Sequence, residues 1–116
     1  MTRYCKAVVK GKVICEKVEL ADTFFRRFMG LMYRKKLDEN AGLLLDPCKE
    51  IHTFGMKFAI DTLTISRDNI IIYIDENIAP RRVRPGVKDG KKVLELNAGT
   101  IKKYGLELGD LVEFQE

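Results

Sequence analysis

The feature that most constrains this chain is a series of short apolar runs, rich in β-branched residues and bounded by turn residues. Residues 70–74, which are four isoleucines and a tyrosine, form the most β-prone of these runs. Lys10-Gly11, residues 67–69 and Asp89-Gly90 are typical turn sequences between neighbouring runs. Because such tight connections join antiparallel strands, the pattern predicts a mostly antiparallel sheet.

The runs predict about seven or eight strands and two short helices in one domain spanning residues 1–116. The first helix is expected to begin after Asp22 as its N-cap and to continue for about ten residues, with an aromatic and methionine stripe that covers the sheet. The second is expected from Thr100 to Tyr104. The fold class is therefore mainly β (α+β), a small barrel whose closure leaves few exposed edges.

Composition agrees with a folded, water-exposed domain, since 46% of the residues are hydrophobic and 33% are charged. No apolar run approaches the roughly 20 residues that cross a bilayer, and the N-terminus lacks the apolar region of a secretory signal. We therefore expect a cytoplasmic protein without a membrane partner. Gln115 is the only glutamine and charges of both signs are dense, which resembles the composition of thermophile proteins.

The three cysteines, Cys5, Cys15 and Cys48, are odd in number and form no CxxC pair. This spacing favours neither a disulfide framework nor a zinc site. If Lys10-Gly11 is a two-residue loop, Cys5 and Cys15 are expected on opposite faces of the first hairpin, whereas a three-residue loop would bring them to one face.

Residues 51–66 hold the only histidine, His52, and an acidic residue, Asp61, among apolar neighbours. Apolar residues alternate from Phe54 to Ile60 and then continue on the other parity after Asp61. This change of parity predicts a strand with a bulge or bend near Asp61.

The order of several motifs resembles the uncharacterised family called domain of unknown function 192. The matching segments are residues 30–32 (Gly-Leu-Met), 42–45 (Gly-Leu-Leu-Leu), 52–56 (His-Thr-Phe-Gly-Met), 60–61 (Ile-Asp), 93–99 (Val-Leu-Glu-Leu-Asn-Ala-Gly) and 109–110 (Gly-Asp). In that family a large aromatic residue is usual at the position of Gly55. The resemblance implies a compact, mostly antiparallel β fold with short helices and implies no established activity.

Two readings of His52 and Asp61 stay open. An aspartate beside a histidine can orient and charge it, which would suit acid–base catalysis in a hydrolase-like enzyme. Alternatively, Asp61 accepts backbone N–H groups at a bulge and His52 caps a loop. A nucleophilic pair of Cys48 and His52 has no supporting local signature, and neither a metal-ligand set nor a cofactor motif is present.

The interpretation we favour is a non-catalytic binding domain. Its predicted rim consists of His52, Thr53, Lys57 and Asp61, with Glu95 nearby, and would hold a small polar ligand or a segment of a protein partner. These polar residues interrupt apolar strands, and such positions in a barrel wall favour a recognition site.

A third hypothesis is a weak nucleic-acid binder that uses Arg81, Arg82 and Arg84, which lie between two prolines and could clamp phosphate or carboxylate groups. The net charge of +4 mildly favours polyanions. However, few aromatic residues are nearby for base stacking, so nucleic acid is not the expected partner. The plainer interpretation is an edge strand whose charges prevent aggregation.

Overall fold

The computed structural model describes residues 2–116, and in this part of the chain nine strands form two sheets. The strands are β1 (Tyr4–Val9), β2 (Lys12–Ala21), β3 (Ala41–Leu45), β4 (Ile51–His52), β5 (Ile60–Ser66), β6 (Ile71–Ile78), β7 (Val83–Arg84), β8 (Gly90–Asn97) and β9 (Glu113–Gln115). The helices are α1 (Phe24–Met29) and α2 (Thr100–Tyr104). The predicted mainly β class with two short helices is confirmed.

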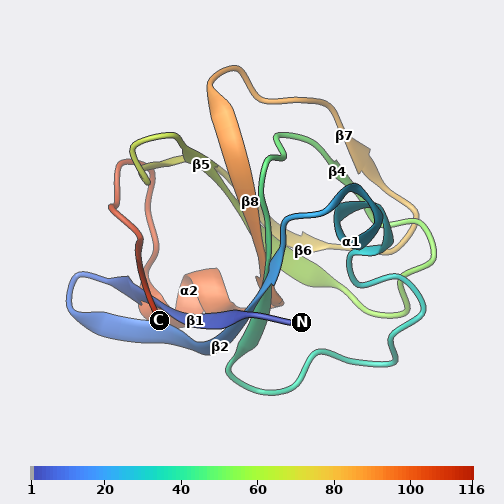
Figure 1. Ribbon diagram of the computed structural model, residues 1–116, viewed down its shortest axis with the longest axis horizontal. Coiled ribbons are helices and arrows are strands. Elements are labelled where there is room, and N and C mark those ends of the chain that lie inside the picture. Colours follow the sequence, from blue (N-terminus) through green and yellow to red (C-terminus); the bar gives the residue numbers. More distant parts are fainter. Residues whose placement is uncertain (1) are drawn as a thin grey trace.

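Seven strands form one curled, half-barrel sheet in the order β6-β5-β8-β3-β2-β1-β9 (Figure 1). Neighbouring strands within this sheet are antiparallel, with the exception of β2 and β3. These two are parallel and are joined by the crossover that contains α1. The C-terminal segment links both edges of the sheet. Leu111 forms a bridge with Ile70, beside β6, and β9 then pairs with β1.

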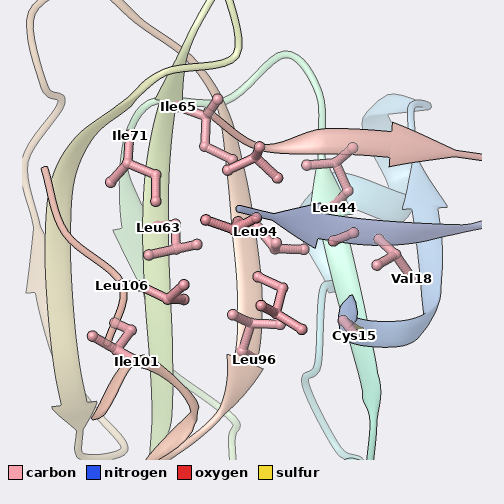
Figure 2. Packing of buried hydrophobic residues seen from close by; sticks show 14 of the residues in the cluster. Cys15, Val18, Leu44, Leu63, Ile65, Ile71, Leu94, Leu96, Ile101 and Leu106 are labelled. Atoms are coloured by element: carbon pink, nitrogen blue, oxygen red, sulfur yellow. The ribbon is translucent and has the colours of Figure 1, made fainter. Parts of the chain in front are cut away.

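The interior of the curl is filled by one apolar core (Figure 2). Leu63, Leu94 and Leu96 lie at its centre and are at most 1% exposed. Ile101 of α2 and Leu106, which follows that helix, enter the same core. The prediction that a short helix runs from Thr100 and stops at Gly105 is confirmed.

A second apolar core lies on the opposite face of the same sheet. Side chains alternate along β3, so Leu43 and Leu45 enter the second core while Leu44 enters the first. The same alternation along β8 places Val93 in the second core. Glu95, two residues further along β8, lies on the same face of the sheet as Val93. In Figure 1, α1, β4 and β7 lie on this side of the sheet, away from α2.

Helix α1 is shorter and more exposed than predicted. Thr23, rather than Asp22, is its N-cap, and its hydroxyl accepts a hydrogen bond from the Arg26 N–H (3.1 Å). The helix ends at Gly30, whose φ of 48° suits glycine. No residue of α1 is buried, and its aromatic side chains are 77% (Phe24), 69% (Phe25) and 56% (Phe28) exposed. The predicted stripe is therefore not buried at its phenylalanines, whereas Leu31, which follows the helix, is buried in the second core.

The first hairpin has a two-residue loop, one of the two alternatives that the sequence left open, because Val9 pairs with Lys12. The expectation that its two thiols face opposite sides was nevertheless wrong. A register shift between Ala7 and Val8 pairs Cys15 with Ala7, on whose face Cys5 also lies, and a second shift follows between Ala7 and Cys5. Both cysteines consequently lie in the interior core, as free thiols.

Residues 51–66 do not form one bent strand. They form β4, a turn-containing segment at residues 53–59, and β5. The predicted irregularity near Asp61 is present, since the pairing of β5 with β6 shifts register between Ile60 and Thr62. The two-residue strand β7 pairs only with β4, which agrees with the edge-strand interpretation of the arginine segment.

Candidate functional site

A cavity of about 290 Å³ lies on the second-core side of the sheet. Its wall combines α1 and the turn after it, residues from the end of β3 to β4, one residue of the segment after β4, and one residue of β8. The lining residues are Phe24, Arg27, Phe28, Met29, Gly30, Leu31, Met32, Leu45, Pro47, Cys48, Glu50, Ile51, His52, Met56 and Glu95. The cavity is therefore mostly apolar, with a small number of ionisable groups.

The distinctive group of this cavity is the carboxyl of Glu95. The residue is 3% exposed because β8 is a central strand, with Leu43 and Thr62 opposite Glu95 on its two neighbours. Its Oε1 atom is buried and has no hydrogen-bond partner within residues 2–116. Since most buried polar atoms are paired, such an atom calls for a functional explanation.

Burial raises the pKa of Glu95 from its ordinary value of 4.5 to about 7, because desolvation disfavours the carboxylate. The positive charge of Arg34 opposes this shift. However, no hydrogen bond or ion pair among residues 2–116 joins Arg34 to Glu95, and the Nη2 of Arg34 is instead 3.2 Å from an oxygen of Glu19. A carboxyl with a pKa near neutrality in a cavity is a recognised mark of a functional site.

Aromatic rings form a continuous row at the cavity and beside it. The ring centroids of Phe24 and Phe28 are 6.4 Å apart, those of Phe28 and His52 are 6.4 Å apart, and those of His52 and Phe54 are 6.2 Å apart. The (i, i+4) spacing on α1 places the first pair on one side of the helix. The pairing of β4 with β7 places His52 opposite Val83, so that the imidazole reaches the row.

Asp61 has a structural role and lies elsewhere. Its Oδ1 accepts a hydrogen bond from the Asn77 N–H (2.8 Å), and its Oδ2 accepts from the N–H groups of Gly99 and Ile101 (both 3.0 Å). It is 1% exposed and does not line the cavity. The structure thus does not bring together the His52–Asp61 pair on which the acid–base hypothesis depends, and the backbone-binding alternative describes Asp61 correctly.

Two further residues of the predicted rim also lie outside the cavity. The hydroxyl of Thr53 donates to the carbonyl of Ala79 (2.7 Å) and accepts from the Arg82 N–H (2.8 Å), so it fixes the segment before β7. Lys57 is exposed and does not line the cavity. Of the five residues predicted as a ligand site, the structure brings only His52 and Glu95 to one cavity.

The three arginines do not form one clamp. The guanidinium of Arg84 is held by four hydrogen bonds, to Asp75 (3.0 Å), Thr64 (2.7 Å) and the carbonyls of Lys49 and Pro85. It also lies over the ring of Tyr73. Arg81 and Arg82 remain exposed. The guanidinium of Arg84 is thus engaged within the fold and does not join Arg81 and Arg82 in the predicted anion site.

Cys48 lines the cavity as well, but its thiol is not activated. It donates to the carbonyl of Glu50 (3.0 Å), and burial raises its pKa, which disfavours the nucleophilic thiolate. Within residues 2–116, no hydrogen bond joins it to His52. In the same part of the chain, no three side chains of His, Cys, Asp or Glu gather in a way that could hold a metal ion.

The contribution of α1 to the cavity is not apparent from the sequence. Phe24 and Phe28 have the spacing of a core helix, so their period alone does not distinguish a buried stripe from a cavity wall. The available signal is Gly30, which ends the helix before the stripe is complete.

Among residues 2–116, neither helix has the length and apolar character that a membrane span requires.

The fold and cavity define a small half-barrel β domain with a helix-walled pocket on the outer face of its sheet. The family model described as DUF192, uncharacterized ACR, matches residues 6–114. The chain belongs to this uncharacterised family, and the resemblance seen in the sequence motifs is confirmed.

Curated relatives carry only the designation UPF0127. A protein from Pyrococcus furiosus is 29% identical over 112 residues, which cover 92% of this chain and 94% of the relative. A protein from Thermococcus kodakarensis is 32% identical over 111 residues, covering 90% and 69% of the two chains. Both organisms' proteins are thus similar over nearly the whole of this chain.

Two solved structures are similar in fold. A "putative transcription regulator" from Sinorhizobium meliloti has a TM-score of 0.86 and 30% identity, with 97% of this chain and 95% of that chain covered. A protein of unknown function from Novosphingobium aromaticivorans has a TM-score of 0.81 and 24% identity, with 95% and 84% covered. The second likeness concerns the fold alone.

Proposed function

We propose that this protein is a binding module that holds a small molecule in the cavity above Glu95. The observation that carries the proposal is the buried Oε1 of Glu95, which has no hydrogen-bond partner among residues 2–116 and belongs to a residue that lines a mostly apolar cavity. Leaving a buried polar group unpaired costs about 1–3 kcal/mol. A ligand group that forms a hydrogen bond with this carboxyl would offset that cost, which is why the unpaired oxygen supports a binding site.

The surroundings of Glu95 define the kind of molecule that fits. A volume of about 290 Å³ is at the small end of ligand pockets, which hold roughly 300–1,000 Å³. The rings of Phe24 and Phe28 provide apolar contact area near the opening. The ligand is therefore a small molecule with one polar group, directed at Glu95, and an apolar part that packs against α1.

The proposal is tested by screening a fragment library with ligand-observed and two-dimensional NMR. Hits are expected to shift the amide signals of α1, β4 and the middle of β8. Phe28→Ala is expected to weaken those hits by about tenfold, because removing an aromatic contact costs about 1 kcal/mol or more.

Phe25→Ala is the matched control. Phe25 is as exposed as its neighbours on α1 but does not line the cavity, so this variant is expected to bind as the wild type does. Hits that bind both variants equally well, or that shift signals on another face, would refute the proposed site. A library without a single hit would do the same.

A further inference from the structure

We propose that the polar group of the ligand is cationic, so that the cavity recognises a small organic monocation such as an alkylammonium. This inference rests on the proposed function and adds the chemical class of the ligand. It starts from the pairing of charges around the cavity, where the buried carboxyl of Glu95 has no cationic partner.

The basic side chains near Glu95 are already engaged. Arg27 lines the cavity, but its Nη1 donates to the carbonyl of Asp22 (2.8 Å). Arg34 is paired with Glu19. Of the six ion pairs within residues 2–116, none includes Glu95. A ligand cation would supply the missing partner.

The charges of the residues that line the cavity also favour a positively charged ligand. Glu95, when ionised, and Glu50 contribute two negative charges, and Arg27 contributes one positive charge. An anionic ligand would meet a buried carboxylate, and like charges brought together in a desolvated site are strongly unfavourable. An ammonium group would instead form a charge-assisted hydrogen bond with Glu95 Oε1.

The aromatic row supports a cation as well. The faces of aromatic rings carry negative electrostatic potential and attract a cation within about 6 Å. Phe24, Phe28 and His52 all line the cavity in which Glu95 lies. An apolar chain attached to the ammonium group would pack on the same rings.

A cationic ligand and a neutral ligand are distinguished by their dependence on pH. A cation favours the ionised carboxyl of Glu95, so its binding releases a proton and strengthens as pH rises through the pKa of about 7. A neutral acceptor would use the protonated carboxyl and would weaken over the same range. The other titratable or charged groups around the cavity are Arg27, Arg34, Cys48, Glu50 and His52.

The test compares three probes that share a six-carbon chain: hexylammonium, hexanol and hexanoate. Calorimetric or NMR titrations are made at pH 6 and pH 8 with the wild-type protein and with Glu95→Gln. Hexylammonium is expected to bind most tightly to the wild type, with roughly tenfold higher affinity at pH 8, since the ionised fraction of a group with a pKa of about 7 rises about tenfold.

Glu95→Gln is expected to abolish both the preference for hexylammonium and its increase with pH. Glu76→Gln, which removes an exposed carboxyl on β6, is the matched control and should behave as the wild type does. Well-dispersed amide spectra of both variants establish that they are folded. If Glu95→Gln were unfolded, proton release on hexylammonium binding to the wild type in buffers of different ionisation enthalpy would still decide between cation and neutral ligand.

The outcomes separate this inference from the proposed function. If hexanol binds as tightly as hexylammonium, or if affinity falls as pH rises, the ligand is not a cation, although the cavity remains a binding site. If no probe binds, the cationic inference fails. The proposed function fails with it only when the fragment library also yields no hit that Phe28→Ala weakens.

Discussion

The substitution Glu95→Gln is expected to stabilise the folded protein at neutral and alkaline pH. Glutamine has nearly the same shape as glutamic acid and cannot ionise. The wild-type protein must bury a carboxylate once the pH exceeds the pKa of the folded form, and burial of an unpaired charge is unfavourable. The variant avoids this cost, so the two proteins should diverge in stability as the pH rises.

The size of the effect follows from the shift in pKa. The pKa is about 7 in the folded protein against 4.5 ordinarily, a difference of about two and a half units. Each unit corresponds to 1.36 kcal/mol, so the wild type loses roughly 3 kcal/mol of stability through this group. Because the folded pKa is the higher one, the loss is absent below pH 4.5, accumulates between pH 4.5 and 7, and is complete above pH 7.

The assay is urea unfolding of both proteins at pH 4.5, 6 and 8 and constant ionic strength. The free energies of unfolding should be similar at pH 4.5, and Glu95→Gln should be more stable by roughly 3 kcal/mol at pH 8. Glu76→Gln should follow the wild type throughout. A difference between Glu95→Gln and the wild type that does not change with pH would refute the reasoning, because it would show that the folded and unfolded proteins hold this proton equally.

Two other substitutions test the structural roles assigned to polar residues. Asp61→Asn should destabilise the protein by about 3 kcal/mol in urea unfolding, because one backbone N–H faces an amide donor and two lose a charged acceptor. The exposed Asp68→Asn is its control, and a loss below about 1 kcal/mol would contradict the role of Asp61. Arg84→Lys should cost about 2 kcal/mol in the same assay, since one ammonium cannot replace a fork that makes four hydrogen bonds. Arg82→Lys, at an exposed position, should be neutral, and equal effects of the two lysine substitutions would count against this account.

The strands and turns of the barrel were predictable because local chemistry decides them. Lys10-Gly11 forms the expected hairpin turn, and Gly105 ends α2 as expected. The register of the first hairpin was not predictable, because a bulge near Ala7 leaves no clear mark in the apolar pattern. One bulge is enough to bring Cys5 to the face that holds Cys15.

The candidate site was predictable only in part. Glu95 and His52 attract attention as polar residues among apolar ones, and both line the cavity. Asp61 attracts the same attention, yet it binds three backbone N–H groups, and composition alone does not separate these roles. The contribution of Phe28 depends on which face of a short helix meets the sheet, which is a tertiary property.

The exposure of α1 separates two roles, forming the wall of a pocket and stabilising the fold, which the same residues often share. This helix forms one wall of the cavity while burying none of its own side chains. Exchanges at Phe24 and Phe28 therefore reshape the cavity wall at little cost in folding free energy, whereas Glu95 belongs both to the cavity wall and to the buried part of the sheet. Under the proposed function, proteins with this half-barrel fold would differ in ligand preference through this one wall, and randomising Phe24 and Phe28 would retarget the pocket.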